Sequence, residues 1–228
     1  MAEKTRPGTT ATRQRLLRAA EELFAERGVA ATLTREITER ARQGNSSALH
    51  YHFGSREGLL NSILSEHQQR VEAALGPALA ELDRDAPLAA LTRAYVAAED
   101  AELAHDSGRY CLRIVAQLAH ETGFRDGAPH RALRDSLLWQ LFERVDARLV
   151  QDLGVPPDLA KERVESMVML VGAAFADRAR QVQSGRRQAV GGARYCADLT
   201  SMLTAMLGAA GDGCFIDEDG AAGPDGEA

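Results

Sequence analysis

The chain of 228 residues has few cysteines and no long apolar run. Its three cysteines, Cys111, Cys196 and Cys214, are widely spaced and odd in number. This pattern fits neither a disulfide framework nor paired metal ligands, so we expect reduced thiols. No stretch of about 18 apolar residues is present, which excludes an ordinary transmembrane helix. The first 15 residues are polar where a secretion signal needs an apolar centre, so we expect a cytoplasmic protein without a membrane partner.

The sequence also lacks the motifs of common enzymes. It contains no GxSxG, GxGxxG, phosphate-loop or SxxK pattern, and its only lysines are Lys4 and Lys161. Aromatic residues make up only 5% of the chain. His50 and His52 are two positions apart, so on a helix they point about 200° apart and cannot share one ion. We therefore predict no enzymatic activity, no cofactor and no metal site.

Helical periodicity runs through most of the chain, and no convincing strand pair accompanies it. The predicted fold class is all-α, with about nine helices. We expect them at residues 11–27, 32–41, 45–53, 56 to about 76, 87–105, 109–121, 130–154, 157–183 and 192–207. The last 18 residues hold six acids and no base, so we predict a disordered acidic tail over 211–228.

Local signals mark the ends of the first four helices. Gly28 follows an apolar stripe and stands where a left-handed helix end is favoured. Thr32 or Thr34 is a suitable N-cap for the second helix, Asn45 for the third and Ser55 for the fourth. The spacing thus predicts two short helices, joined by a polar turn, after a longer first helix.

Helices of about eight residues are unstable alone, so the second and third need the first as a packing partner. Three helices in this order are typical of a DNA-reading unit, in which the last one enters the major groove. Residues 1–56 hold ten basic and six acidic side chains, a formal charge of +4. The remainder carries −10, because the whole chain carries −6. A basic N-terminal region on an acidic body indicates that only this region meets a polyanion.

Three stretches, "LLRAAEELFAERG", "TLTREITERA" and "ALHYHFGSREGLL", together resemble the N-terminal DNA-binding domain of TetR/AcrR-family transcriptional regulators. The turn differs from the family's usual "AGVS". It reads "ARQGNS", one residue longer, and its glycine is Gly44 rather than residue 42. Arg56 stands where family members usually have a lysine. The chain thus resembles a subgroup with a longer helix-turn-helix turn.

The resemblance implies a DNA-binding domain over residues 1–56 and a larger helical ligand-binding and dimerisation domain over 57–210. It implies a homodimeric repressor that binds double-stranded operator DNA and is released by a small-molecule inducer. Two alternatives stay open. One is an activator or a ligand-independent regulator with the same DNA-binding domain. The other is a helical enzyme or scaffold that acquired this domain.

In such a domain, hydroxyls and a cation suit phosphate contacts, whereas exposed polar side chains early in the short helices suit base edges. The candidates for phosphate contacts are Thr34, Tyr51, Ser55 and Arg56, and those for base edges are Arg35, Asn45, Ser46, Ser47 and His50. Arg35 is the best candidate for a bidentate contact to guanine. Arg6 or Arg13 could reach the backbone or a minor groove. We assign His52 and Phe53 to packing; solvated surface is the alternative for the others.

The resemblance also implies a pocket and a dimer interface in the larger domain. The pocket candidates are polar or aromatic residues within apolar faces, for which ordinary core is the alternative: Tyr95, Tyr110, Arg113, Gln117, Trp139 and Phe142. The segment 164–176 is apolar on two sides, which suggests two packing partners. The expected dimer residues are Val164, Val168, Val171, Phe175, Leu199, Met202, Leu203 and Met206. A central helix of a monomer is the alternative.

Overall fold

The computed structural model describes residues 7–43, 47–130 and 133–210. Within these ranges the chain forms nine α-helices, one 3₁₀ turn and no strand, which confirms the all-α prediction. The helices are α1 (Pro7–Arg27), α2 (Thr34–Arg40), α3 (Ser47–Phe53), α4 (Arg56–Ala80), α5 (Leu88–Glu102), α6 (Asp106–Leu118), α7 (Leu137–Leu153), α8 (Pro157–Gln183) and α9 (Gly192–Leu207). The predicted acidic tail, Cys214 and the arm residue Arg6 lie outside the described residues.

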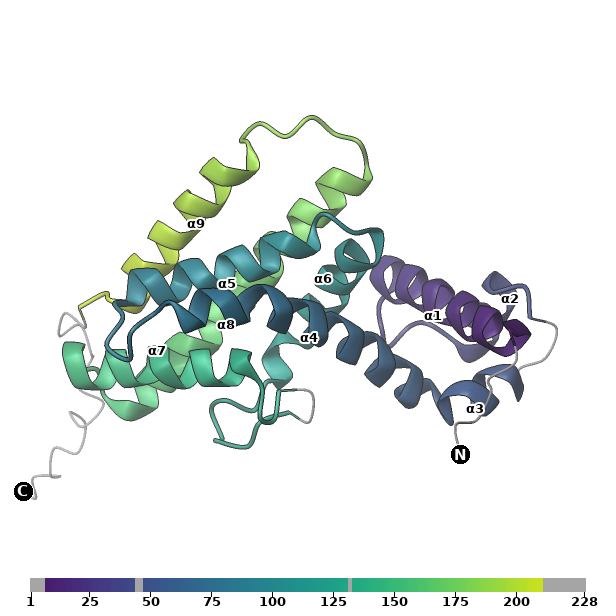
Figure 1. The fold of residues 1–228 in the computed structure, drawn as a ribbon, viewed down its shortest axis with the longest axis horizontal. Helices are drawn as coiled ribbons and strands as arrows, with labels where there is room; N and C mark the ends of the chain where they lie inside the picture. The colour runs from purple at the N-terminus through teal and green to yellow at the C-terminus, as the bar shows by residue number, and fades with distance from the viewer. Residues whose placement is uncertain (1–6, 44–46, 131–132, 211–228) are drawn as a thin grey trace, which may run out of the picture.

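The molecule is elongated, with α1, α2 and α3 at one end and α5, α7, α8 and α9 towards the other (Figure 1). Helix α4 runs from the first group into the second, and the segment between α8 and α9 projects from the body (Figure 1). Cys111 and Cys196 are free thiols, as expected. None of the helices in the described parts of the chain combines the length and hydrophobicity that crossing a bilayer requires.

Most predicted helices are confirmed, but several boundaries differ: α5 ends at Glu102 rather than residue 105, and α6 spans Asp106–Leu118 rather than 109–121. Helix α1 begins at Pro7 rather than residue 11, in the first turn where a proline needs no N–H partner. Helix α4 continues through Pro77 to Ala80. The predicted start of α7 at residue 130 was wrong, because Asp135 has a left-handed backbone (φ 61°) and interrupts the helical path. Helix α7 begins only at Leu137, capped by Ser136.

Two apolar cores hold the chain together. The first, which we call the head core, lies among α1, α2, α3 and the start of α4, and it also contains Cys111 and Ile114 of α6. The second, the body core, lies among α4 to α9. Helix α6 contributes to both cores, because Leu112 belongs to the body core while Cys111 and Ile114 belong to the head core. Helix α4 does the same, with Leu59 and Ile63 in the first and Val71 and Leu75 in the second.

Candidate nucleic-acid interface and ligand pocket

The connection from α1 to α2 is organised by Gly28 and Thr32. Gly28 has φ 100° and donates its N–H to Phe24 O at 3.1 Å, which confirms it as the end of α1. Thr32 is 2% exposed, and its hydroxyl donates to Gly28 O at 2.8 Å. Because Thr32 turns inward, Leu33 becomes the N-cap of α2, and the expectation of a threonine cap was wrong.

Glu36 replaces the missing threonine cap. Its Oε2 accepts the Leu33 N–H at 2.9 Å, and its Oε1 lies 2.6 Å from an Arg27 guanidinium nitrogen. The Leu33 hydrogen bond lowers the pKa of Glu36, and Arg27 adds to this effect. The start of α2 is thus fixed from both sides, which sets the direction of the neighbouring Thr34 and Arg35.

The turn after α2 contains an unusual backbone. Arg42 has φ 54°, a left-handed conformation that glycine adopts most readily. The Gln43 N–H then donates to Thr38 O at 2.9 Å and closes the described part of the turn. Gly44, together with the candidates Asn45 and Ser46, lies outside the described residues. The longer turn therefore places an arginine in the conformation that glycine would adopt more easily.

Helix α3 buries one side and exposes the other. Leu49 belongs to the head core, whereas Ser47, His50 and Tyr51 are exposed. Tyr51 is 77% exposed, the largest value among the exposed large hydrophobic side chains. A large amphipathic ring that lies in water contributes little to the head core, and it suits contact with a sugar-phosphate backbone.

The joint between α3 and α4 is tight. Gly54 has φ 73° and its N–H donates to His50 O at 2.8 Å, which ends α3. Ser55 is the N-cap of α4, as predicted, and accepts the Gly58 N–H at 2.9 Å. A Cβ on Gly58 would lie 2.0 Å from Phe53 O, so only glycine fits there. This joint fixes α3 relative to the long helix that enters the body.

The described DNA-contact candidates lie on α2, α3 and the start of α4. These elements and α1 form one end of the molecule, which we call the head (Figure 1). Arg35, Ser47, His50, Tyr51 and Ser55 are exposed there, and Thr34 is half-buried at the first position of α2. Ser55 accepts a hydrogen bond but keeps its own O–H for donation. These side chains could therefore contact a large polar surface together.

Arg56 points in a different direction from the other candidates. Its Nε donates to Thr32 O at 3.1 Å, and another guanidinium nitrogen donates to Val29 O. The guanidinium carbon lies 5.1 Å from the Phe24 ring centroid. In this conformation the guanidinium joins the start of α4 to the α1–α2 connection. A lysine could not make both bonds with this planar geometry.

The residues assigned to packing lie beneath the α3–α4 joint. Phe53 is half-buried against the head core, and the Arg13 guanidinium carbon lies 5.1 Å from its ring centroid. Arg13 also forms an ion pair with Glu66 at 3.6 Å. Burial lowers the pKa of His52, and the charge of Arg13 lowers it further, which keeps the imidazole neutral. Arg13 thus lies against α4, at the edge of the candidate DNA-contacting surface.

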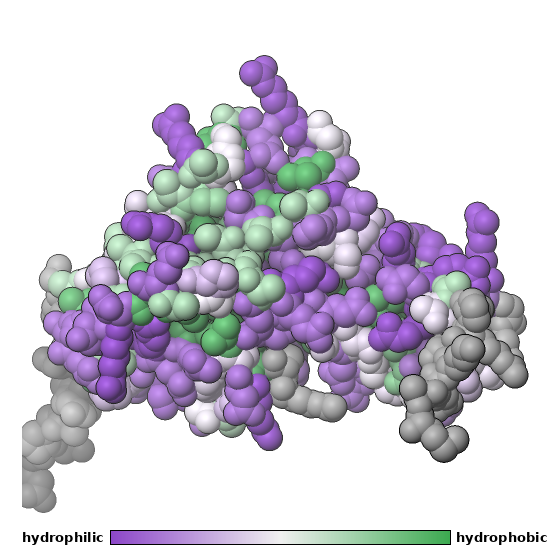
Figure 2. Space-filling model, in the orientation of Figure 1, coloured by the Kyte–Doolittle hydropathy of each residue, from purple (hydrophilic) through white to green (hydrophobic). Residues whose placement is uncertain are grey.

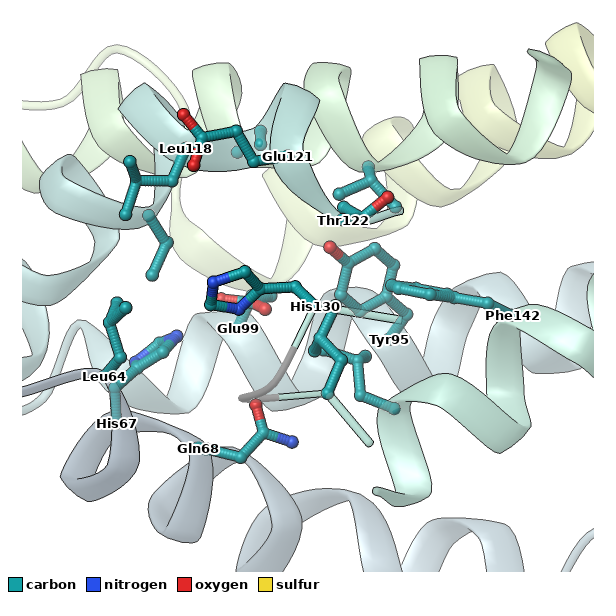
Figure 3. A pocket seen from close by; sticks show the side chains of 16 residues that line it. Leu64, His67, Gln68, Tyr95, Glu99, Leu118, Glu121, Thr122, His130 and Phe142 are labelled. Atoms are coloured by element: carbon teal, nitrogen blue, oxygen red, sulfur yellow. The ribbon is translucent and has the colours of Figure 1, made fainter. Parts of the chain in front are cut away.

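The body contains a cavity of about 120 Å³, lined by α4, α5, α6, α7, α8 and the segment between α6 and α7. Two pocket candidates, Tyr95 and Phe142, line it and pack edge to face with centroids 5.5 Å apart (Figure 3). Most of the remaining wall is apolar. The polar lining residues come mainly from α4, α5 and the α6–α7 segment, and they are His67, Gln68, Glu99, Glu121, Thr122 and His130.

A buried ion network lies beside this cavity. Glu102 accepts two hydrogen bonds from Arg70, each at 2.8 Å, and its Oε2 lies 2.7 Å from His67 Nδ1. Burial raises the pKa of Glu102, but the bonds from His67 and Arg70 outweigh it and lower the pKa to about 2. Glu102 is therefore ionised and orients the His67 ring towards the cavity (Figure 3).

Glu99 lies three residues before Glu102 on α5, is 5% exposed and lines the cavity. Burial raises the pKa of Glu99; the charge of His67 lowers it and that of Glu102 raises it. Glu99, His67 and His130 all line the cavity (Figure 3). Glu99 and His67 were not among the pocket residues predicted from the sequence. The available signal was an acid one helical turn after Tyr95 in an otherwise apolar stretch.

Three other pocket candidates lie where α6 meets the head. Gln117 accepts the Val29 N–H at 2.8 Å and donates to Phe24 O at 3.1 Å. Arg113 donates to Ala25 O at 2.8 Å and to Gln183 Oε1 at 2.9 Å, and Tyr110 packs against the head core. These side chains do not line the cavity; they bind the end of α1 to the body.

Trp139, the last pocket candidate, does not line the cavity either. Its ring packs against Phe124 with centroids 5.0 Å apart, and its indole N–H donates to Glu143 at 2.8 Å. Phe124 in turn packs edge to face on Phe142, with centroids 6.1 Å apart. Trp139 therefore supports the cavity wall from behind.

Most of the expected dimer residues are used inside the chain. Val164, Val168, Val171, Phe175, Leu199 and Leu203 are buried in the body core, and Met206 is half-buried against it. The six buried side chains therefore pack within the chain rather than on its surface. Met202, in contrast, is 53% exposed on α9.

An apolar surface of small side chains surrounds α9. Ala97 of α5 and Ala193, Ala197 and Ala205 of α9 are exposed and border a shallow groove between the two helices. Figure 2 shows this region as a pale green area over α5 and α9. Small side chains let another helix approach closely, so this surface could pack against a second protein chain.

Comparison with known proteins supports the all-α fold and the prediction that the N-terminal helices bind DNA. The family model described as bacterial regulatory proteins, tetR family, matches residues 16–63. That span runs from the first helix to the beginning of α4 and includes the whole candidate DNA-contacting region described above. No protein with a curated description matches the sequence.

Several solved structures share the fold. One is NalD, the secondary repressor of the MexAB-OprM multidrug efflux pump in Pseudomonas aeruginosa, with a TM-score of 0.51, 20% identity, and coverage of 87% of this chain and 96% of NalD. Another is Mycobacterium smegmatis AmtR, with a TM-score of 0.53, 21% identity and 92% coverage of each chain. A tetR-family regulatory protein from Rhodococcus RHA1 has a TM-score of 0.50, 20% identity, and coverage of 87% and 98%.

Proposed function

We propose that the chain, whose residues 16–63 match the model of the tetR family of bacterial regulatory proteins, is a homodimeric transcriptional repressor of that family and is released from its operator by a small molecule. It works in the cytoplasm on double-stranded DNA and catalyses no reaction. The repressor described for NalD, a protein of similar fold, is one precedent for this choice over an activator. The observation that carries the proposal is the sharing of α4 and α6 between the head core and the cavity-bearing body.

In the proposed complex α3 enters the major groove. Arg35, Ser47 and His50 contact base edges, together with Asn45 and Ser46, while Thr34, Tyr51 and Ser55 contact phosphates. The exposure of the described members of this set supports these assignments. Arg56 adds positive charge near the phosphates but acts mainly by fixing the α1–α2 connection, because two of its guanidinium nitrogens donate to backbone carbonyls there.

The dimer would place two heads on one face of the DNA, in successive major grooves. We propose that α9 forms the centre of the interface, with Met202 and the neighbouring small side chains in contact with the partner. Met169, 36% exposed on α8, would lie at its edge. The buried members of the expected set would support the interface from within the chain.

Ligand release requires that a change in the cavity reach the head. Leu64, His67 and Gln68 of α4 line the cavity, while Leu59 and Ile63 of the same helix belong to the head core. Leu118 of α6 also lines it, and Gln117 beside it binds the end of α1. A ligand that binds better to a conformer with different α4 and α6 positions would favour a different head spacing.

The test is an electrophoretic mobility shift with the DNA upstream of the chain's own gene, at two salt concentrations. We expect Arg35→Ala to weaken specific binding about tenfold or more, the loss of one bidentate base contact. Arg84→Ala, a change of an equally charged, exposed arginine between α4 and α5, should leave the affinity unchanged. Equal affinity for random DNA would contradict the proposal.

A second candidate function is an activator or a ligand-independent regulator with the same head. A transcription reporter fused to the bound DNA separates these possibilities. A repressor lowers the reporter signal when the protein is present, whereas an activator raises it.

A further inference from the structure

We propose that the cavity binds small apolar amines and that the Glu99 carboxylate holds their ammonium group. This inference rests on the proposed function, because it names the class of ligand that would release the repressor. It assigns a role to a buried acid that the DNA-reading mechanism does not use.

The size and walls of the cavity define the apolar part of the ligand. Its volume of about 120 Å³ is close to the roughly 150 Å³ of a protein cavity that takes up benzene. Phe142 and Tyr95 offer ring faces and edges, and Leu138 and Val168 offer aliphatic surface. A ligand with one ring or a short branched chain fits these dimensions and this wall.

The charges around the cavity define the polar part. Among the described residues that line it, none is a lysine or an arginine, whereas Glu99 and Glu121 are acids. Arg70, the nearest arginine in the ion network, is bound to Glu102. An anionic ligand would therefore face two carboxyl groups, and the lining side chains that can become cationic are the imidazoles of His67 and His130.

Glu99 differs from Glu102 in its partners. Glu102 has His67 and Arg70 as donors, and its pKa lies far below the ordinary value. Burial raises the pKa of Glu99 although the charge of His67 lowers it, so the neighbouring groups compensate an ionised Glu99 only in part. An ammonium group entering the cavity would supply the missing positive charge and take hydrogen-bond contact with the carboxylate.

A second carboxyl group adds to the negative potential from the opposite wall. Glu165 of α8 is 1% exposed and accepts a hydrogen bond from Thr122, which lines the cavity, at 2.6 Å. Its other oxygen has no hydrogen-bond partner among the described residues. Burial raises the pKa of Tyr95, and the charges of Glu99 and Glu165 raise it further. The electrostatic field of both acids therefore reaches this residue of the cavity wall.

Three compounds of nearly equal shape test this inference: benzylamine, benzyl alcohol and benzoate. Calorimetric titration of the full chain at neutral pH should give the tightest binding for benzylamine, at least about tenfold tighter than for benzoate. Glu99→Gln should remove this preference and leave binding of benzyl alcohol unchanged. Glutamine has the shape of the protonated acid, so we expect the variant to fold.

Glu81→Gln is the control, because Glu81 is an exposed acid at the end of α4 that does not line the cavity. It should keep the preference for benzylamine. Preferred binding of benzoate to the unchanged protein, equal binding of all three compounds, or no binding of any would overturn the inference, whether or not Glu99→Gln folds.

The mobility shift without any ligand tests the proposed function separately. A chain that binds its DNA but does not prefer benzylamine is a regulator with a different ligand class. A chain that prefers benzylamine but does not bind DNA specifically has the pocket chemistry without the proposed function.

Discussion

Single residues in the head hold conformations that cost free energy. Arg42 adopts a left-handed backbone, which disfavours an ordinary L-residue by about 1–2 kcal/mol. Glycine avoids this cost but loses more conformational entropy on folding, roughly 0.5–1 kcal/mol. The longer turn of this chain thus contains a residue whose replacement should reveal the backbone strain directly.

We expect Arg42→Gly to leave the free energy of unfolding unchanged or to raise it by up to about 1 kcal/mol. Arg42→Val should lower it by about 1–2 kcal/mol, because a β-branched side chain tolerates the left-handed region least. Urea unfolding followed by circular dichroism measures both. Equal stability of the two variants would show that the turn does not hold this backbone in solution.

Glu102 is a buried acid whose negative charge stabilises the folded body. Its folded pKa of about 2 lies below the ordinary 4.5, so its carboxylate stabilises the fold above pH 4.5. That contribution, about 3 kcal/mol from the size of the shift, is lost as the pH falls from 4.5 towards 2. We expect Glu102→Gln to lower the free energy of unfolding by about that amount at pH 7.

The pH dependence distinguishes this effect from a general packing defect. The stability difference between Glu102→Gln and the unchanged protein should shrink as the pH falls below 4.5, because the unchanged protein loses its carboxylate contribution there. Denaturant unfolding at a series of pH values measures this difference. A difference that stays constant with pH would rule out the ionised network.

At the scale of elements, the joint between α3 and α4 decides how the reading helix is held. A side chain at position 58 would meet Phe53 O, so Gly58→Ala should shift α3 against α4. We expect specific DNA affinity to fall about tenfold or more. A mobility shift measures the affinity, and circular dichroism checks that the variant stays helical.

Gly76→Ala is the matched control on the same helix. A Cβ there would lie 3.4 Å from a Leu137 methyl group, close to ordinary contact, and alanine favours the helix interior by about 1 kcal/mol. This variant should keep DNA affinity and stability. If both alanine variants behave alike, the tight joint has no part in DNA binding.

The helices themselves were largely predictable from the sequence. Helices α8 and α9 span the predicted residues 157–183 and 192–207, because a proline or glycine marks each start. The start of α7 was not predictable, because the helical periodicity continues through Asp135 while its backbone is left-handed and interrupts the helix. The threonine cap of α2 also failed, because the turn after α1 brings the Thr32 hydroxyl to the carbonyls of Leu23 and Gly28.

At the scale of the whole molecule, the exposed surface of α9 is available for a partner. We expect Met202→Asp to place a charge in the proposed interface and to shift the protein from dimer to monomer. Sedimentation equilibrium measures the shift, and DNA affinity should fall with it, because two heads bind together.

Leu33→Asp provides the comparison, since Leu33 is 49% exposed at the start of α2, at the other end of the molecule from α9 (Figure 1). It should leave the dimer intact. A protein that is monomeric without any substitution, or a Met202→Asp variant that remains dimeric, would refute the proposed interface.

The sequence by itself determined the order of the helices and the DNA-reading character of the head. These follow from local rules, namely apolar spacing, caps and charge, which act within a few residues along the chain. Only the tertiary structure decided which polar side chains meet. Gln117 and Arg113 share an apolar helix with pocket-lining residues but bind α1, and Glu99 faces the cavity while Glu102 is paired. Their roles depend on neighbours many residues away, which helical periodicity does not encode.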